Sequence, residues 1–515
     1  MPALLDKWAT LGWVTLPLVI GFSIYLLPKL DRILALLVTL VSLSYGIWRL
    51  LQPTPLILQL VDSQGVRLLA DTLSGYLILT NALVTLAIIF YCWSSRKSAF
   101  FYTQLSILHG SVNAIFICAD LISIYVALEV ISIAAFLLIA YSRTARSVWI
   151  GLRYLFISNT AMLFYLVGVI LTYQAQRSFA FEALQGAPPE AIALVLMGLL
   201  AKGGVFVSGL WLPLTHAEAE TPVSAMLSGV VVKTGIVPLV RLAIAVPDLE
   251  PILQLFSVGT AILGVSGAIL ATNTKRLLAF STISQMGFVL VTPVAAGFYA
   301  LTHGLAKAAL FMAAGKLPSR QFEELRKTPI DLKLWLAIAI PGLSVAGLPF
   351  LAGFAAKTQA LKALAGWPAI FMNVAAIGTA LVFAKFIFLP IHTTKIQARN
   401  RSLQGPVSDP KLASELAPAI TTQPQSDWSG FWVAAIILIS GLVVANGFNP
   451  ETYSSASLTK AVITIAIAWL LHFLVVERVL FGHKTLNFSA AAERFKHLIG
   501  GMSLMLIVLF WLVTA

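Results

Sequence analysis

Apolar runs long enough to cross a bilayer recur from one end of the chain to the other. Of its 515 residues 59% are apolar and 11% are charged, and the mean hydropathy is +0.91, whereas soluble domains are about 25% charged. Runs of about 18 or more apolar residues are typical of transmembrane helices, and these runs lack the alternation expected of barrel strands. The sequence therefore predicts an all-α, polytopic, integral membrane protein.

The apolar runs accommodate sixteen candidate spans, and we expect about 14–16 transmembrane helices. The first run, Leu11 to Leu27, is expected to be a retained span and not a cleaved signal peptide. The candidate spans lie near residues 11–28, 33–51, 75–93, 101–119, 121–141, 150–173, 190–212, 222–246, 252–271, 277–295, 297–315, 334–356, 367–391, 430–448, 458–477 and 499–514.

Positive charge is divided unequally between the loops of this topology. With a non-cytoplasmic N-terminus, the cytoplasmic loops hold about three times as many Lys and Arg residues as the opposite loops, which is the asymmetry of the positive-inside rule. The net charge of +13 then reflects cytoplasmic loops, and no nucleic-acid partner is expected. We expect a multi-pass protein of a bacterial plasma membrane, or of an internal energy-transducing membrane such as the thylakoid.

The chain has few residues that could hold a redox cofactor or a metal. Its two cysteines, Cys92 and Cys118, form no CxxC motif, its seven histidines lack haem-like spacing, and no glycine-rich phosphate loop follows a strand. We therefore expect no cofactor and no metal site in this chain, and the sequence leaves open whether it belongs to an enzyme. A redox subunit that contacts quinone directly is disfavoured for the same reason.

Seven charged residues lie inside runs that otherwise indicate transmembrane helices. A charge at the bilayer centre costs about 2.5–3.5 kcal/mol on insertion scales, so such residues are expected to face protein or water and to be functional. They are Glu129 and the basic residues Arg153, Lys202, Lys233, Lys307, Lys357 and Lys385. This row predicts a pathway for protons or cations. For Arg153 and Lys385, snorkelling to the membrane surface is an alternative.

Helix-breaking residues accompany two of the buried lysines. Lys202 is followed by Gly203 and Gly204, and Lys357 is preceded by Gly347. Broken helices at mid-membrane depth expose backbone dipoles and make room for water or ions. We therefore expect the seventh and twelfth spans to be discontinuous.

A weak internal repeat is also present. An offset of 155 residues relates Lys202 to Lys357 and brings Lys233 to within three residues of Lys385. This predicts two five-helix repeats, inverted relative to each other because each has an odd number of spans. The expected division is N-terminal transmembrane helices at 1–100, a first repeat at 101–246, a second repeat at 247–391, a polar cytoplasmic loop at 392–429 and C-terminal transmembrane helices at 430–515.

Four stretches with characteristic charges occur in order: Asp120–Glu129; Trp211–Pro213 with Thr221–Ala225 and Val232–Gly235; Lys275–Gly287; and His303–Phe311 with Gly347–Pro349 and Gly353–Lys357. Together they resemble the proton-conducting, antiporter-like subunits of Mrp cation/proton antiporters and of complex I-type NADH dehydrogenases. The resemblance covers about residues 70–390.

The resemblance implies a first group of proton-transfer residues. Glu129 matches the acid of the fifth helix, Lys202 matches the lysine of the broken seventh helix with which it pairs, and Lys233 matches the lysine of the eighth. Because burial favours the neutral form of lysine and a carboxylate favours the charged form, opening the Glu129–Lys202 pair is expected to release a proton toward Lys233.

A second group follows farther along the chain. His303 and Lys307 match the His-x-x-x-Lys of the eleventh helix, and Lys357 matches the terminal lysine of the broken twelfth. Arg153 stands where the family often has lysine, and it is a less certain member of the pathway, as is Lys385.

The choice between the two kinds of complex depends on few residues. One complex I subunit, the M type, usually has Glu where this chain has Lys357, so lysine favours an L- or N-type subunit or an Mrp D-type subunit; the stretch Thr215–Pro222 is closer to the Mrp side. We expect a subunit that translocates protons, or Na⁺ against protons, together with other membrane subunits and in contact with the lipid bilayer.

An Mrp-type antiporter is favoured, and the alternative is a proton-pumping membrane-arm subunit of a complex I-like NAD(P)H or ferredoxin:quinone oxidoreductase. Two further alternatives are a relative coupled to inorganic-carbon uptake, and a purely structural membrane scaffold. The scaffold is disfavoured because it would bear the cost of intramembrane charges without using them.

Overall fold

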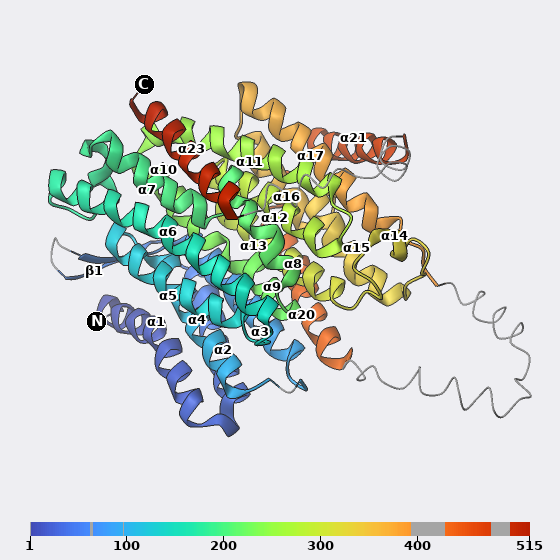
Figure 1. Ribbon diagram of the computed structural model, residues 1–515, viewed down its shortest axis with the longest axis horizontal. Coiled ribbons are helices and arrows are strands. Elements are labelled where there is room, and N and C mark those ends of the chain that lie inside the picture. Colours follow the sequence, from blue (N-terminus) through green and yellow to red (C-terminus); the bar gives the residue numbers. More distant parts are fainter. Residues whose placement is uncertain (1, 62–64, 96, 393–427, 475–494, 515) are drawn as a thin grey trace, which may run out of the picture.

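The computed structural model describes residues 2–61, 65–95, 97–392, 428–474 and 495–514. Within these ranges the chain is a bundle of helices with one small hairpin (Figure 1). The N-terminal part contains α1 (Pro2–Leu26), α2 (Asp31–Leu51), β1 (Leu56–Val61), β2 (Gly65–Ala70), α3 (Thr72–Tyr91), α4 (Ala99–Ile117), α5 (Leu121–Ile139) and α6 (Ala145–Gln176).

The middle of the chain contains the helices that hold most of the buried charges. They are α7 (Pro189–Lys202), α8 (Leu212–Glu218), α9 (Thr221–Met226), α10 (Lys233–Ala245), α11 (Glu250–Leu270), α12 (Thr274–Leu290), α13 (Pro293–Ala314), α14 (Phe322–Leu325), α15 (Leu332–Ala346), α16 (Ala352–Lys362) and α17 (Gly366–Ile387). The C-terminal part contains α20 (Trp428–Asn446), α21 (Ser455–Leu471) and α23 (Phe495–Thr514).

Thirteen helical stretches in the described ranges are long and apolar enough to cross a membrane. The other three expected spans correspond to α4, α12 and the pair α15–α16, which are shorter or less apolar. The prediction of an all-α, multi-pass membrane protein is therefore confirmed. The expected loop at 392–429 and a polar segment at 478–497 lie almost wholly outside the described residues.

Polar side chains fix where several of these helices begin. Asp71, Asp120 and Asn273 each precede a helix and accept a hydrogen bond from a backbone N–H of its first turn, at 2.9, 2.7 and 3.2 Å. Such N-caps satisfy backbone donors that a helix leaves free. In an apolar chain they mark helix starts clearly.

The hairpin of β1 and β2 was not predicted. Its strands pair antiparallel, with Leu56 opposite Ala70 and Gln59 opposite Arg67. The Arg67 N–H donates a 2.8 Å hydrogen bond to the Asp120 carboxylate at the start of α5. The hairpin is therefore fastened to the end of the bundle at which α3 and α5 begin.

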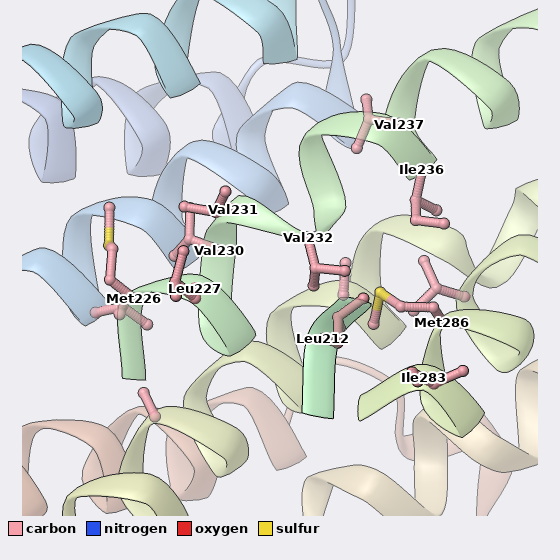
Figure 2. Packing of buried hydrophobic residues seen from close by; sticks show 14 of the residues in the cluster. Leu212, Met226, Leu227, Val230, Val231, Val232, Ile236, Val237, Ile283 and Met286 are labelled. Atoms are coloured by element: carbon pink, nitrogen blue, oxygen red, sulfur yellow. The ribbon is translucent and has the colours of Figure 1, made fainter. Parts of the chain in front are cut away.

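The centre of the bundle is α13, which packs against α3, α12, α15, α16 and α20. Helices α1 and α2 lie at one end of the molecule and α17 and α21 at the other, while α23 crosses over α7 (Figure 1). Figure 2 shows part of the buried apolar cluster around α8, α10 and α12, in which Leu212, Val232 and Met286 take part. Buried polar groups in this interior must find partners within the protein.

Two helices are interrupted beside buried lysines. Helix α7 ends at Lys202, and the chain passes through Gly204 at φ +67° before a 3-10 helix leads into α8. Helix α15 ends at Ala346, and Gly347 follows at φ +90°, where glycine is favoured. Lys202 precedes its break whereas Lys357 follows its own, so an offset of 155 residues does not align the two interruptions. The inverted repeats and domain limits remain a prediction.

Candidate functional site

Five basic residues expected to transfer protons are buried in the centre of the bundle. Lys202, Lys233, His303, Lys307 and Lys357 are between 0 and 6% exposed. They come from α7, α10, α13 and α16. Buried ammonium groups need several hydrogen-bond acceptors, so their partners show how each is held.

Lys202 is held by two hydroxyl groups. Its Nζ donates to Ser132 Oγ of α5 at 2.6 Å and to Ser158 Oγ of α6 at 2.5 Å. The same Nζ lies 5.5 Å from the centre of the Tyr154 ring, which adds a cation–π contact. Hydroxyl and aromatic groups thus support the charge without neutralising it.

Glu129 lies on α5 one turn before Ser132 and is half-buried. Among the described residues it forms no salt bridge within 4.0 Å, although it interacts electrostatically with Lys202. The acid and the lysine are therefore near each other but not in contact. Ser132 and Ser158 occupy the positions of direct partners.

Lys233 follows a π-helical turn that provides its acceptors. The π turn spans Leu227–Val231, and the Lys233 Nζ donates to the carbonyls of Gly229 at 2.5 Å and Ser228 at 3.3 Å. A wider turn leaves carbonyls without their usual helical donors. Gly229 faces Gly304 of α13, and only glycine permits this close approach.

His303 and Lys307 share one face of α13 at a spacing of four residues. Both interact electrostatically with Lys233. The Lys307 Nζ donates to the Leu278 carbonyl of α12 at 3.1 Å and lies 5.3 Å from the Phe383 ring. Both ring nitrogens of His303 are buried without a hydrogen-bond partner in the structure. Neither ring nitrogen is therefore occupied by a protein group among the described residues.

A small cavity lies beside His303. Its volume is about 10 Å³, close to the minimum for one water molecule. It is lined by Gln285, Tyr299, Thr302, His303, Ser344, Val345 and Gly353. The Tyr299 hydroxyl donates to Gln285 Oε1 at 2.7 Å. The cavity thus extends from α13 to the break between α15 and α16.

Lys357 lies in α16, on the other side of that break. Its Nζ donates to the carbonyls of Val345 at 2.8 Å and Ala346 at 3.2 Å, the last residues of α15. A cation at the C-terminal end of a helix is favourable because free carbonyls gather there. A larger cavity, of about 250 Å³, extends from Lys357 between α16, α17 and α21.

Arg153 and Lys385 are also buried. Arg153 lies over the Trp149 ring at 6.0 Å. Lys385 donates to the carbonyls of Ile269 at 2.5 Å and Ala271 at 3.1 Å, at the C-terminal end of α11. Capping of α11 favours a structural role for Lys385.

Sequence reasoning misses a buried lysine and a buried histidine. Lys275 lies between the expected spans 252–271 and 277–295, where a loop is predicted, but it is fully buried and donates to the Ala219 carbonyl at 3.0 Å. From the sequence, His216 is expected either to gate an entry at the membrane edge or to be solvated. In the structure it is fully buried, and its Nδ1 lies 3.0 Å from the Leu212 carbonyl. Arg276 is adjacent to Lys275 and equally basic, so no local feature of the sequence marks Lys275 as the buried one.

An ion pair between Arg241 and Asp71 was missed as well. The guanidinium donates to both carboxylate oxygens at 3.1 Å, and also to Ser74 Oγ at 2.7 Å. Burial alone would raise the pKa of the Asp71 carboxyl, but the Arg241 charge and hydrogen bonds from Arg241 and Ser74 lower this pKa below its usual range. This pair joins α10 to the start of α3.

No group of three or more His, Cys, Asp or Glu side chains that could hold a metal occurs in the ranges the structure describes.

Comparison with known proteins gives matches over most of the chain. The profile of the family described as "NADH:quinone oxidoreductase/Mrp antiporter, TM" matches residues 118–382. The D-type subunit of the Na(+)/H(+) antiporter of Alkalihalophilus pseudofirmus is 28% identical over 57% of this chain and 66% of its own length, slightly less than two thirds. NAD(P)H-quinone oxidoreductase chain 4 1 of Synechococcus elongatus is 29% identical over 73% of this chain and 79% of its own length.

Two solved structures share the fold. A chain of the Mrp complex from Dietzia sp. superposes with a TM-score of 0.70 at 20% identity, over 90% of this chain and 98% of that one. A chain of an archaeal membrane-bound sulfane sulfur reductase superposes with a TM-score of 0.68 at 20% identity, over 87% of this chain and all of the other. The matches confirm the resemblance inferred from the four sequence stretches.

Proposed function

Because the chain belongs to the NADH:quinone oxidoreductase/Mrp antiporter transmembrane family, we propose that it is an antiporter-like subunit that moves protons, or exchanges Na⁺ for protons. It does so within a complex with other membrane subunits, in an energy-transducing membrane. We favour an Mrp-type cation/proton antiporter, since one relative is the D-type subunit of a Na(+)/H(+) antiporter.

The observation that carries this proposal is the row of buried bases from Lys233 to Lys357. Lys233 donates to the Gly229 carbonyl, which faces Gly304, the residue after His303, and His303 borders the small cavity. Val345 lines the same cavity and accepts a hydrogen bond from Lys357. One water in that cavity would connect the imidazole to the break before α16.

Each basic group in the series can hold or release a proton. Neutral lysine and neutral imidazole both accept hydrogen bonds, and burial weakens the preference of lysine for its charged form. The large cavity beyond Lys357 provides a connection toward the surface. Protons would then pass along the bundle from Lys233 toward α16.

Lys202 and Glu129 regulate the start of this series. The separated arrangement, with Lys202 bound to two serines, is the state in which the ammonium is held by neutral groups. Approach of Glu129 would favour the charged lysine, and its withdrawal would favour proton release toward Lys233. The backbone at Gly203, next to Lys202, packs against Gly235, two residues after Lys233. A movement of the chain at Lys202 would therefore displace the chain at Lys233.

The second candidate function is a proton-pumping subunit of a complex I-like oxidoreductase. Longer matches favour it, because the NAD(P)H-quinone oxidoreductase chain 4 of Synechococcus elongatus and the N-type subunit of the NADH-quinone oxidoreductase of Desulforudis audaxviator align with 79% and 85% of their own lengths. The membrane would be a plasma membrane or an internal one, with the N-terminus on the non-cytoplasmic side.

Reconstitution of the whole complex in proteoliposomes tests these proposals. An antiporter acidifies or alkalinises the lumen when a Na⁺ gradient is imposed, whereas a complex I-like pump responds only to an electron donor and a quinone. Lys202→Ala is expected to abolish either response, and Lys333→Ala, an exposed lysine at the start of α15, is the control. Unimpaired transport by Lys202→Ala would refute the proposal.

A further inference from the structure

The cavity beyond Lys357 is lined by more positive charge than proton transfer requires. Its volume is about 250 Å³, and its lining includes three lysines, Lys357, Lys362 and Lys460, but no acidic residue. The Lys357 side chain is buried, whereas those of Lys362 and Lys460 are exposed at the rim of the cavity. Three ammonium groups around one space repel one another unless an anion lies between them.

The two rim lysines have no acidic partner within the described residues. Other basic residues do: Arg241 pairs with Asp71 at 3.1 Å, and Arg67 with Glu182 at 3.4 Å. Lys357 uses two of its three N–H donors on the Val345 and Ala346 carbonyls. One donor of Lys357 therefore remains for a ligand in the cavity.

The remaining lining supplies further donors and an apolar wall. Thr358 and Ser457 contribute hydroxyl groups, whereas the Thr464 hydroxyl already donates to the Lys460 carbonyl. Ser457 lies in the first turn of α21, a helix of 17 residues whose N-terminal end is electropositive. Phe354 and Leu361 form an apolar side of the cavity. Lysines, hydroxyls and a helix N-terminus together are the donor set that recognises phosphate oxygens.

We infer that this cavity binds a phosphate-bearing anion, either the headgroup of an anionic phospholipid or free inorganic phosphate. The cavity opens between α17 and α21, where Ile370 and Val462 are exposed apolar residues, so a headgroup from a surrounding membrane would reach it. Bound there, the anion compensates the charge of Lys357 from outside the protein. The site would make Lys357 sensitive to the composition of the surrounding membrane.

The test uses the purified complex, delipidated in neutral detergent. It is titrated separately with inorganic phosphate and with short-chain phosphatidylglycerol, and saturable binding is followed by native mass spectrometry and by thermal stabilisation. Lys362→Gln/Lys460→Gln is compared with the wild type and with Lys333→Gln. Each rim lysine is expected to contribute about fivefold to the affinity, so the double variant binds roughly 25-fold more weakly.

Each outcome decides the proposal. Saturation by phosphatidylglycerol alone identifies a lipid headgroup, and saturation by phosphate alone identifies a soluble anion; both support the site. The proposal is overturned if neither ligand saturates, if the double variant binds as tightly as the wild type, or if Lys333→Gln loses as much affinity. Because Lys362 and Lys460 are exposed, the double variant should retain its unliganded melting temperature, and the single variants provide a second comparison.

Discussion

The ammonium of Lys357 donates a 2.8 Å hydrogen bond to the carbonyl of Val345, the residue that also lines the small cavity beside His303. This contact connects Lys357 to the cavity beside His303 across a helix break. Replacing Lys357 by Met removes the donor and keeps much of the apolar volume. Proton transport by the complex in proteoliposomes, followed with a pH-sensitive dye, should fall by about a hundredfold, whereas Lys333→Met should transport normally.

The two serines that hold Lys202 provide a prediction about pH. Hydrogen bonds to a charged group contribute about 1.5–3 kcal/mol each. Removing both in Ser132→Ala/Ser158→Ala destabilises the ammonium form, so the lysine releases its proton at lower pH. The pH profile of transport should therefore shift toward acid by at least about one unit. Ser111→Ala, whose hydroxyl only bonds the Ile107 carbonyl of its own helix, should leave the profile in place.

Glu129 should affect transport more than stability. It forms no direct ion pair in the described residues, but it interacts electrostatically with Lys202. Glu129→Gln should change the free energy of unfolding by less than about 1 kcal/mol while reducing transport severalfold. Chemical unfolding and flux assays on the same preparation measure both quantities. A variant that is strongly destabilised would assign Glu129 to the scaffold.

The Arg241–Asp71 pair should stabilise the fold in a pH-dependent way. Arg241 is buried but the Asp71 side chain is 27% exposed, so removing the carboxylate should cost less than it does in a fully buried pair, where the cost is about 3–5 kcal/mol. Asp71→Asn should still lower the melting temperature measurably. Because the pKa of Asp71 is lower in the folded state, its stabilisation is present above the unfolded pKa of about 4 and is lost as the pH falls through the folded value. The wild type should lose more stability on acidification than Asp71→Asn.

An exposed pair supplies the control for that measurement. Arg67 and Glu182 lie 3.4 Å apart, with side chains 35% and 55% exposed. Arg67→Gln should therefore cost less than about 1 kcal/mol. Equal effects of Arg67→Gln and Asp71→Asn would contradict the assignment of Asp71 to a buried anchoring contact.

The crossing of α13 with the π turn should not tolerate a side chain. A Cβ on Gly304 would contact Thr80 and would lie 2.7 Å from the Gly229 carbonyl, the acceptor of Lys233. Gly304→Ala should destabilise the protein by about 1–3 kcal/mol and reduce transport. Gly12→Ala in α1, where no atom lies within 4 Å of the added carbon, should be neutral or stabilising. Thermal unfolding of both variants tests the contrast.

The spans and the buried bases could be predicted because each is recognised from a short stretch of consecutive residues. A lysine within an apolar run, such as Lys233, is unusual wherever its neighbours lie in space. Partners could not be predicted, because Ser132 and Ser158 are 70 and 44 residues from Lys202, and which helix faces meet is decided by packing.

Charges near the ends of spans were the main source of error. Arg241 and Lys275 have the same local surroundings as loop charges, yet they are 4% and 0% exposed. Each is buried because a partner, Asp71 or the Ala219 carbonyl, comes from a distant segment. The hairpin at 56–70 was missed because its strands are short and follow an apolar span.

Main-chain oxygens, and not carboxylates, accept the hydrogen bonds of Lys233, Lys307 and Lys357. A peptide carbonyl has no net charge, so each ammonium can become a neutral amine without stranding an opposite charge in a medium of low dielectric constant. When a proton leaves, the site becomes neutral and no unpaired negative charge stays behind. An interior whose lysines were paired with carboxylates would hold each proton tightly. Here the lysines are bound by neutral carbonyls, so the positive charge can pass from one base to the next.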